Sequence, residues 1–203
     1  MLTSDLAPTR SALLQLHEEY DVVLEAYDFL DEKRLLLAAE ILRQLRDYEK
    51  LLQEYETLRQ GAEKALIATI QRHGLQGTQV YPGRYLEFAA INMATTRFMG
   101  VTLVTTELQI PEVIEELPVC HPSPEADHCR KQFLQLTLLS AKLAGVSGNL
   151  HRLLAEYRRT ERRARVLENV IIPEMSQTLH VMSTRLEELD QEDIVRVHLK
   201  HGG

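Results

Sequence analysis

The sequence predicts a mainly helical protein, built as a long antiparallel two-helix coiled coil with a small β-hairpin insertion between the helices. Apolar residues recur every three or four positions through two long windows, which is the spacing of a coiled-coil seam. The composition is typical of long helices, with no Trp and only four Phe. Pro is absent from residues 9–81 and 125–172, and Gly is absent from residues 1–60 and 149–201, so nothing breaks a helix there.

The N-terminal region, residues 1–73, is predicted to form the first coiled-coil helix. It begins at Pro8-Thr9-Arg10, where a first turn tolerates Pro, and ends near His73 before Gly74. At 1.5 Å per residue this helix would be on the order of 95 Å long. Arg34 occupies a seam position, and the four-residue steps from Leu37 to Leu45 predict a stutter. The predicted seam contains Leu13, Leu16, Tyr20, Val23, Tyr27, Leu30, Leu37, Ile41, Leu45, Tyr48, Leu52 and Tyr55.

The middle region, residues 74–123, is predicted to hold the hairpin and a Pro-rich loop. Thr, Val, Phe and Ile residues in TTRFMGVTLVTTEL, and more weakly in YLEFAAINM, favour strands. Gly100 is expected at a bulge within them. Residues 110–127 contain four prolines and are expected to be an irregular loop.

The C-terminal region, residues 124–203, is predicted to form the second coiled-coil helix. Ser123-Pro124-Glu125 supplies an N-cap, a first-turn Pro and an acidic residue at its start. Pro173 should kink or bulge the helix, because it lacks an N–H group and clashes with the carbonyl of Asn169. A break into two helices is the alternative, but the seam resumes at once after Pro173. The predicted seam contains Phe133, Leu136, Leu143, Val146, Leu150, Leu153, Tyr157, Ala164, Leu167, Ile171, Met175, Leu179, Met182, Leu186 and Leu189.

Two long helices joined by a compact insertion must fold back antiparallel to bury their seams against each other. The residue numbers of facing partners should then sum to about 200, which places Leu13 near Leu186 and Gly61 near Gly145. A helix pair buries only one stripe of each helix, so apolar residues off the seam should stay exposed and require other partners. These residues are Leu14, Val22, Leu36 and Ile172.

The net charge of −7 argues against general nucleic-acid binding and against attraction to anionic lipid. No apolar run approaches the ~18 residues of a membrane span, so no direct membrane insertion is expected. The N-terminus lacks a signal-peptide pattern, and two cysteines are too few for a disulfide framework. A cytoplasmic location, with membrane association only through partner proteins, is therefore expected.

A loop with two Cys and two His is the nearest approach to a chemical site. Cys120-His121 and His128-Cys129 could bind zinc or form a disulfide, but adjacent ligands are not the usual finger spacing. Free thiols in a loop are favoured. The sequence has no Gly-rich phosphate loop and no nucleophile elbow, so a non-enzyme without cofactor or metal is predicted.

An arginine belt precedes Pro173 and wraps much of the helix circumference. One account is a solvated face, paired with Glu156, Glu161 and the opposite helix. The other account is an electrostatic contact with an acidic ring around the helix pair. Spacing alone leaves both open. The belt contains Arg158, Arg162 and Arg165 on one face and Arg152, Arg159 and Arg163 on another.

Several motifs resemble the D subunit of the V-type ATPases, the central rotor shaft of the peripheral sector. They span both predicted helices, and the C-terminal block with its proline is the most specific. The matching residues are Pro8-Thr9-Arg10 with Leu13, Lys33-Arg34, Met99-Gly100-Val101, Arg163 with Leu167-Glu168 and Ile171-Ile172-Pro173, then Thr178 and Leu186-Glu187-Glu188.

The resemblance implies a non-catalytic coiled-coil shaft whose paired termini insert into a hexamer of nucleotide-binding A and B subunits. The F subunit would bind its side, and the far end would meet the connector subunit of the membrane ring. The shaft would transmit torque between ATP hydrolysis or synthesis in the hexamer and ion translocation, such as proton transport, by the ring. The protein would then be cytoplasmic and peripheral to the membrane.

The resemblance and the arginine belt together predict two sets of contact residues. The insertion is expected to supply a ring-side contact through Met99, Gly100 and Val101. The rotor bearing and the shaft tip are expected to contain Pro8, Thr9, Arg10, Leu13, Lys33, Arg34, Arg158, Arg162, Arg163, Arg165, Glu168, Pro173, Glu187 and Glu188.

Three other interpretations stay open at this point. The gamma-type shaft of F-type ATPases is the closest mechanical rival, but it needs a longer α/β domain between the helices. A non-rotary coiled-coil adaptor or secretion-associated stalk would use the same helices without rotation. An enzyme acting through the Cys/His loop would require bound metal and loss of activity in Cys129→Ser.

Overall fold

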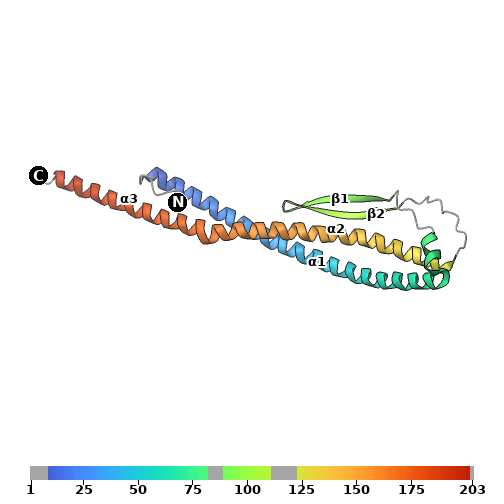
Figure 1. Ribbon diagram of the computed structural model, residues 1–203. Coiled ribbons are helices and arrows are strands. Elements are labelled where there is room, and N and C mark those ends of the chain that lie inside the picture. Colours follow the sequence, from blue (N-terminus) through green and yellow to red (C-terminus); the bar gives the residue numbers. More distant parts are fainter. Residues whose placement is uncertain (1–8, 82–88, 111–122, 202–203) are drawn as a thin grey trace. The chain divides into compact units, whose positions relative to one another are not determined.

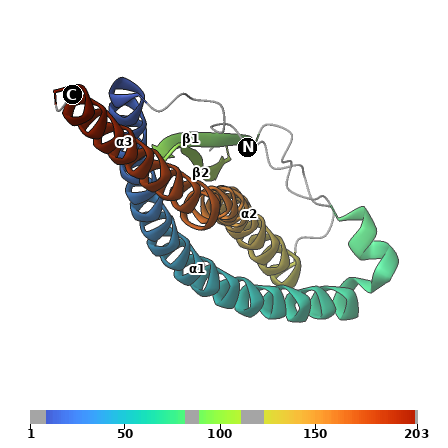
Figure 2. The same cartoon turned by 90° about the vertical axis from the view of Figure 1, so that its left-hand side faces the viewer.

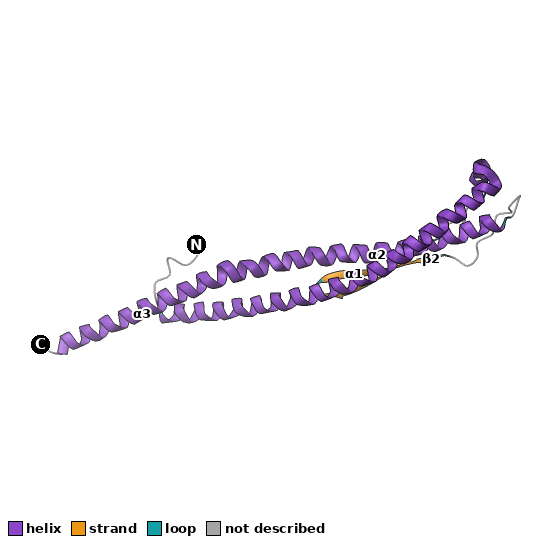
Figure 3. Cartoon of the chain, turned by 90° about the horizontal axis from the view of Figure 1, so that it is seen from below, coloured by secondary structure: helices purple, strands orange, loops and turns teal. Residues whose placement is uncertain are grey.

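The computed structural model describes residues 9–81, 89–110 and 123–201 and confirms the mainly helical fold class (Figures 1 and 3). Two long helices lie in contact, with a two-stranded antiparallel hairpin between them in the chain. In order, the elements in these ranges are α1 (Arg10–Val80), β1 (Ala90–Phe98), β2 (Val101–Gln109), α2 (Pro124–Val166), the π-helix η1 (Leu167–Ile171) and α3 (Ile172–His201).

The helices contribute to two compact units. One unit contains residues 37–156, which hold the hairpin, the second half of α1 and most of α2. The other contains residues 1–36 and 157–203, which hold the start of α1, the end of α2 and all of α3. Because both long helices enter both units, the compact units cross the boundaries of the secondary structure elements.

Both helix starts lie where the sequence predicts them, because each has a hydroxyl N-cap. The N–H of Ala12 donates to Thr9 Oγ1 at 3.2 Å, and the N–H of Ala126 donates to Ser123 Oγ at 3.2 Å. Pro8 lies outside the described residues. The sequence predicts an end near His73, whereas α1 continues to Val80 across an interruption at Gly74, whose φ of 70° and ψ of 169° are not helical.

The seam of α1 is more regular than predicted. Leu45 and Leu52, expected in the seam, are 39% and 36% exposed, whereas Gln44 is only 7% exposed. Gln44 takes the seam position because its amide donates to Glu40 Oε1 at 3.0 Å, which satisfies a buried polar group. The predicted stutter is therefore wrong. Alternating steps of three and four connect buried or half-buried residues through positions 13, 16, 20, 23, 27, 30, 34, 37, 41, 44, 48, 51, 55, 58, 62, 65 and 69.

In the unit that contains the terminal helices, α1 and α3 pair antiparallel as predicted (Figure 2). Leu16, Leu179 and Met182 form its buried cluster, and Leu13, Ala12, Tyr20 and Met175 pack against them. Arg10 and Asp190 form an ion pair of 2.8 Å. Leu189, expected in the seam, is 45% exposed.

In the unit of residues 37–156, α1 and α2 also pair antiparallel. Thr69 Oγ1 donates to the carbonyl oxygen of Glu125 at 3.2 Å, and the Glu125 carboxylate pairs with Arg72 at 2.8 Å. The predicted contact of Gly61 with Gly145 is wrong, because a Cβ atom on Gly61 would meet Gln132. The start of α2 sets a different phase, which buries Ala126 and Cys129 and leaves Phe133, expected in the seam, 41% exposed.

The hairpin has a continuous antiparallel register from Ala90 opposite Gln109 to Phe98 opposite Val101. Met99 and Gly100 form the two-residue turn, with φ angles of 47° and 84°. Positive φ at both central residues is the requirement of a type I′ turn, which matches the twist of the two strands. The bulge expected at Gly100 is therefore wrong, because the chain reverses there. Part of the weaker predicted strand lies outside the described residues.

Pro173 follows a π-helix inside one continuous helical segment. The helices α2, η1 and α3 succeed one another without a gap, which confirms a continuous helix over two separate ones. The N–H of Ile172 donates to the carbonyl oxygen of Leu167, five residues back. Such a widened turn accommodates the missing N–H group of Pro173, so the helix bulges at the predicted place.

Candidate subunit interface

The hairpin is attached to α2 by the side chain of Asn149, which is 5% exposed. The N–H of Val104 donates to Asn149 Oδ1 at 2.7 Å, and Asn149 Nδ2 donates to the carbonyl oxygen of Val104 at 3.0 Å. Arg152 Nη2 also donates to Asn149 Oδ1, at 2.6 Å. The amide thus satisfies both backbone groups of an edge residue, as a neighbouring strand would.

A second contact brings β2 close to the backbone of α2. Thr106 Oγ1 donates to the carbonyl oxygen of Ala141 at 2.6 Å. Gly145 permits this approach, because a Cβ atom there would lie 2.3 Å from Thr106 Oγ1. Gly145 therefore serves a close approach to the hairpin, whereas the sequence suggested an approach to the first helix.

The three residues predicted for a ring-side contact differ in accessibility. Met99 is 38% exposed and Gly100 is exposed, so the turn of the hairpin is open to a neighbouring protein. Val101 is 6% exposed and Leu103 is 8% exposed, so both belong to the buried side of β2. Of these three residues, only Met99 and Gly100 in the turn are therefore accessible to a partner.

The arginine belt divides into paired and open side chains. Arg165 Nη2 pairs with Glu161 at 2.7 Å, and Arg152 is used at Asn149, so the solvated-face account applies to part of the belt. Arg159 also has an interaction partner. The other three, Arg158, Arg162 and Arg163, are exposed, and within the described residues no carboxylate pairs with them. These three guanidinium groups form the part of the belt that is available to an acidic partner.

The predicted bearing and shaft-tip residues outside the arginine belt differ in burial and in the residues they contact. Leu13 packs on the Leu16 cluster and Arg10 pairs with Asp190, so these two residues join α1 to α3, whereas Thr9 caps α1 itself. Lys33 and Arg34 are half-buried, and Arg34 pairs with Asp31. Glu168, Pro173, Glu187 and Glu188 are exposed, as are Thr9 and the paired Arg10.

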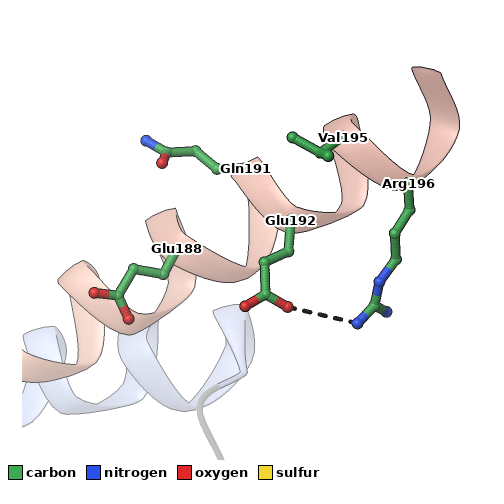
Figure 4. A pocket seen from close by; sticks show the side chains of 5 residues that line it. All are labelled: Glu188, Gln191, Glu192, Val195 and Arg196. Atoms are coloured by element: carbon green, nitrogen blue, oxygen red, sulfur yellow. Dashed lines mark ion pairs between the residues drawn. The ribbon is translucent and has the colours of Figure 1, made fainter. Parts of the chain in front are cut away.

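Glu188 belongs to an open pocket on α3 (Figure 4). Glu192 and Arg196, which form an ion pair of 3.5 Å, lie in the same pocket with Gln191 and Val195. All five residues come from one helix. A single helix cannot enclose a ligand, so these five residues form an open hollow on the helix surface.

Two carboxyl groups, those of Glu40 and Glu125, have a lowered pKa because nearby groups donate hydrogen bonds to them. Arg43 donates to both oxygens of Glu40, at 2.8 and 2.6 Å, and holds the pKa of that carboxyl below its ordinary value. The pKa of Glu125 is also lowered, first by its own backbone N–H at the start of α2 and then by Arg72. Glu40 is paired within α1, whereas the Glu125 carboxylate joins the start of α2 to Arg72 of α1.

The Cys/His loop falls mostly beyond what the structure describes. Cys120 and His121 lie outside the described residues, whereas His128 is exposed and Cys129 is a buried free thiol. In residues 9–81, 89–110 and 123–201, no group of three or more His, Cys, Asp or Glu side chains is placed to hold a metal ion. The zinc and disulfide hypotheses stay untested.

Sequence reasoning did not single out Asn149 or Thr106, the two residues that dock the hairpin. Neither belongs to a recognisable motif. The available signal is a polar residue at position 149 beside two glycines of a predicted helix, Gly145 and Gly148, which marks a place where another segment can approach.

The protein is an antiparallel helix pair with a docked hairpin. Its candidate contact residues lie on helix surfaces and in a turn. This arrangement is typical of a structural component of a larger assembly. The family model for the ATP synthase D subunit matches residues 12–200. The chain therefore belongs to the family of V/A-type ATP synthase D subunits, the non-catalytic central stalk subunits of the ATP synthase complex.

Individual relatives match over nearly the whole chain. The V-type ATP synthase D subunit of Thermotoga neapolitana is 27% identical, over 95% of each chain. The A-type ATP synthase D subunit of Methanoregula boonei is 28% identical, over 97% of this chain and 96% of its own. The V-type ATP synthase D subunit numbered 2 of Treponema pallidum is 26% identical, over 94% and 91%. Within the described residues, no helix is long and apolar enough to cross a membrane.

Proposed function

We propose that this central stalk protein acts as a rotor shaft. It transmits torque between ATP hydrolysis or synthesis in a hexamer of A and B subunits and ion translocation by a membrane ring. The observation that carries the proposal is the seam of α1, whose steps of three and four continue from Leu13 to Thr69 without a stutter. A seam of this kind keeps the same side of a helix against its partner along its whole length.

Torque passes along a helix pair only if the helices cannot slip past each other. Directional contacts resist slippage better than apolar packing, because they have one optimal register. Such contacts occur in each compact unit: Arg10 with Asp190 in one, and Thr69 and Arg72 with Glu125 in the other. These contacts support a shaft that twists little under load.

The proposal includes specific partners and a location. The paired termini would lie within the hexamer, with the open guanidinium groups of Arg158, Arg162 and Arg163 facing an acidic bearing. The F subunit would bind the side of the helix pair, and the connector subunit of the membrane ring would bind the opposite end. The chain would then be cytoplasmic and peripheral to the membrane.

Copurification from native membranes tests this function. We expect one copy of the chain for each hexamer of nucleotide-binding subunits, with the stoichiometry measured by mass spectrometry of the intact complex. A native preparation that contains no nucleotide-binding hexamer would support a non-rotary coiled-coil adaptor and reject the rotor.

A charge-neutralising variant tests the bearing separately. We expect Arg158→Gln with Arg162→Gln to lower ATP-driven ion transport at constant expression, because both side chains are exposed and open. Arg165→Gln is the matched control, since its guanidinium group already pairs with Glu161. Equal transport in all three proteins would exclude the belt as a bearing.

A further inference from the structure

The side of α1 that points away from its seam carries large apolar side chains in residues 10–36. Leu14, Val22 and Phe29 are 65%, 64% and 61% exposed, and Leu36 is 36% exposed. Their spacing of seven or eight residues keeps them on one side of the helix. Apolar side chains in a row on an exposed helix side indicate a contact surface, because isolated ones would be scattered over the circumference.

Carboxylates run along the same side of α1 in steps of three and four. They are Glu18, Asp21, Glu25, Asp28 and Glu32, and all five are exposed. Like charges at this spacing repel each other along a helix. In the described part of the chain no basic side chain pairs with any of the five, although Asp31, which lies off this side, pairs with Arg34.

These nine residues form one surface, the outer face of α1, that is costly to leave in water. Its apolar side chains are hydrated, and its carboxylates repel one another without compensation from the described residues. A partner that covers the apolar side chains and supplies positive charge would remove both costs at once. A contact surface of this composition selects its partner by charge as well as by apolar area.

We propose that the outer face of α1 binds a basic amphipathic helix of a neighbouring protein. The apolar side of that helix covers Val22 and Phe29, and its Lys or Arg residues pair with the carboxylates beside them. The inference rests on the proposed function, since it assigns a partner chemistry to one side of the shaft.

Charge complementarity excludes the other occupants of such a surface. A second copy of this chain, bound through the same face, would bring the same five carboxylates against each other. Nucleic acid and anionic lipid would bring phosphate groups of the same sign. A protein segment rich in Lys or Arg is the occupant that gains on both the apolar and the charged parts.

Photo-cross-linking in the native complex identifies the occupant. The probe is benzoylphenylalanine, placed in the full chain at Phe29 and, as a control, at Glu54, an exposed α1 residue outside the outer face. We expect position 29 to cross-link to a segment of another protein with basic residues spaced by three or four, and position 54 to give no such product. A cross-link from position 29 to an acidic or uncharged segment, or none above the control, would overturn the inference.

A charge-reversed double variant measures how much the surface contributes. We expect Glu25→Lys with Phe29→Ala to weaken retention of the chain in the complex by about tenfold or more, with helical content unchanged by circular dichroism. Glu54→Lys should retain normal binding. Retention of the double variant equal to that of Glu54→Lys would overturn the inference.

The outcomes separate the two proposals. A hexamer that copurifies while position 29 cross-links to nothing would reject the outer face and leave the rotor function intact. A cross-link from position 29 to a basic helix in a preparation without a hexamer would reject the rotor and retain the outer face.

Discussion

Asn149 of α2 holds both backbone polar groups of Val104 in β2, accepting from the N–H at 2.7 Å and donating to the carbonyl at 3.0 Å. A side-chain amide has the same donor and acceptor as a peptide group, so it can occupy the place of a neighbouring strand. The hairpin is therefore a fixed part of the helix to which it is docked.

Removal of this amide should release the hairpin. We expect Asn149→Ala to cost about 1–3 kcal/mol, because two partly buried backbone groups of Val104 lose their partner. The Val104 amide should then exchange its hydrogen faster in hydrogen–deuterium exchange, while α2 remains helical. Asn92→Ala, at an exposed position of β1, is the control. Unchanged protection of Val104 would show that the amide does not anchor the hairpin.

The two helical glycines near Asn149 should respond to Ala with opposite signs. Gly145→Ala forces a Cβ atom to 2.3 Å from Thr106 Oγ1 and should destabilise the protein by about 1–3 kcal/mol. Gly148→Ala meets only the flexible guanidinium group of Arg152, nearest at 3.4 Å, and should stabilise the helix by up to about 1 kcal/mol. Thermal unfolding measures both.

A second substitution locates the cause of the Gly145 effect. Thr106→Ala in the Gly145→Ala background removes the hydroxyl group that the new Cβ atom meets, so the loss of stability should become smaller. A loss that stays the same in the double variant would place the strain elsewhere.

Pro173→Ala should leave folding intact but alter the coupling between ATP hydrolysis and ion movement. Ala restores a backbone N–H group at position 173, next to the C-cap residue Ile172 of η1, so the widened turn loses one of its causes. Coupling is measured as ions transported per ATP hydrolysed in membrane vesicles. Ser176→Ala, at an exposed position one turn further on, is the control. Normal coupling in Pro173→Ala would remove Pro173 from the mechanism.

Stability should fall on acidification through Glu40. Its pKa lies below the ordinary value of 4.5 because Arg43 and Gln44 donate to the carboxylate. A lowered folded-state pKa means that the stabilisation is present at neutral pH and is lost as the pH falls through that pKa. Glu40→Gln should therefore lower the free energy of unfolding at neutral pH by at most about 1 kcal/mol, which is measured as a lower melting temperature. In acid, the melting temperatures of the variant and the parent protein should become equal.

The matched control for this titration is Glu49→Gln, an exposed carboxylate of the same helix. At neutral pH its melting temperature should match that of the parent protein, because the Glu49 side chain is exposed. A difference for Glu40→Gln that persists well below pH 4.5 would assign the effect to packing instead of charge.

The helix pairing could be predicted from the sequence because apolar residues at three-four spacing have one common side to bury. The details of the seam could not. Leu45 and Leu52 fit the apolar spacing in the sequence, but they are exposed in the structure. The rotation of the helix buries Gln44 instead, a polar residue that an apolar pattern does not include. Its burial depends on Glu40, a hydrogen-bond partner that no hydrophobic period reports.

The contact surfaces could be predicted only where residues close together in the sequence form them. The hairpin follows from β-branched residues and Gly100, but its docking joins Val104 to Asn149, 45 residues further along the chain. Neighbours that distant depend on how the insertion folds back, which is why Gly145 was assigned to the wrong partner. Leu14 and Val22 were predictable as exposed residues, because they fall off the seam by spacing alone.

The π-helix at Leu167–Ile171 also shifts the positions of the seam residues that follow it by one residue. If the three-four spacing continued unchanged from Ala164, the seam positions would fall one residue before Met175, Leu179 and Met182. Instead, these three side chains themselves pack against α1. The widened turn absorbs one residue and returns α3 to the same rotational phase. At this turn, loss of one residue would keep the seam facing its partner, whereas elsewhere it would rotate every following side chain by about 100°.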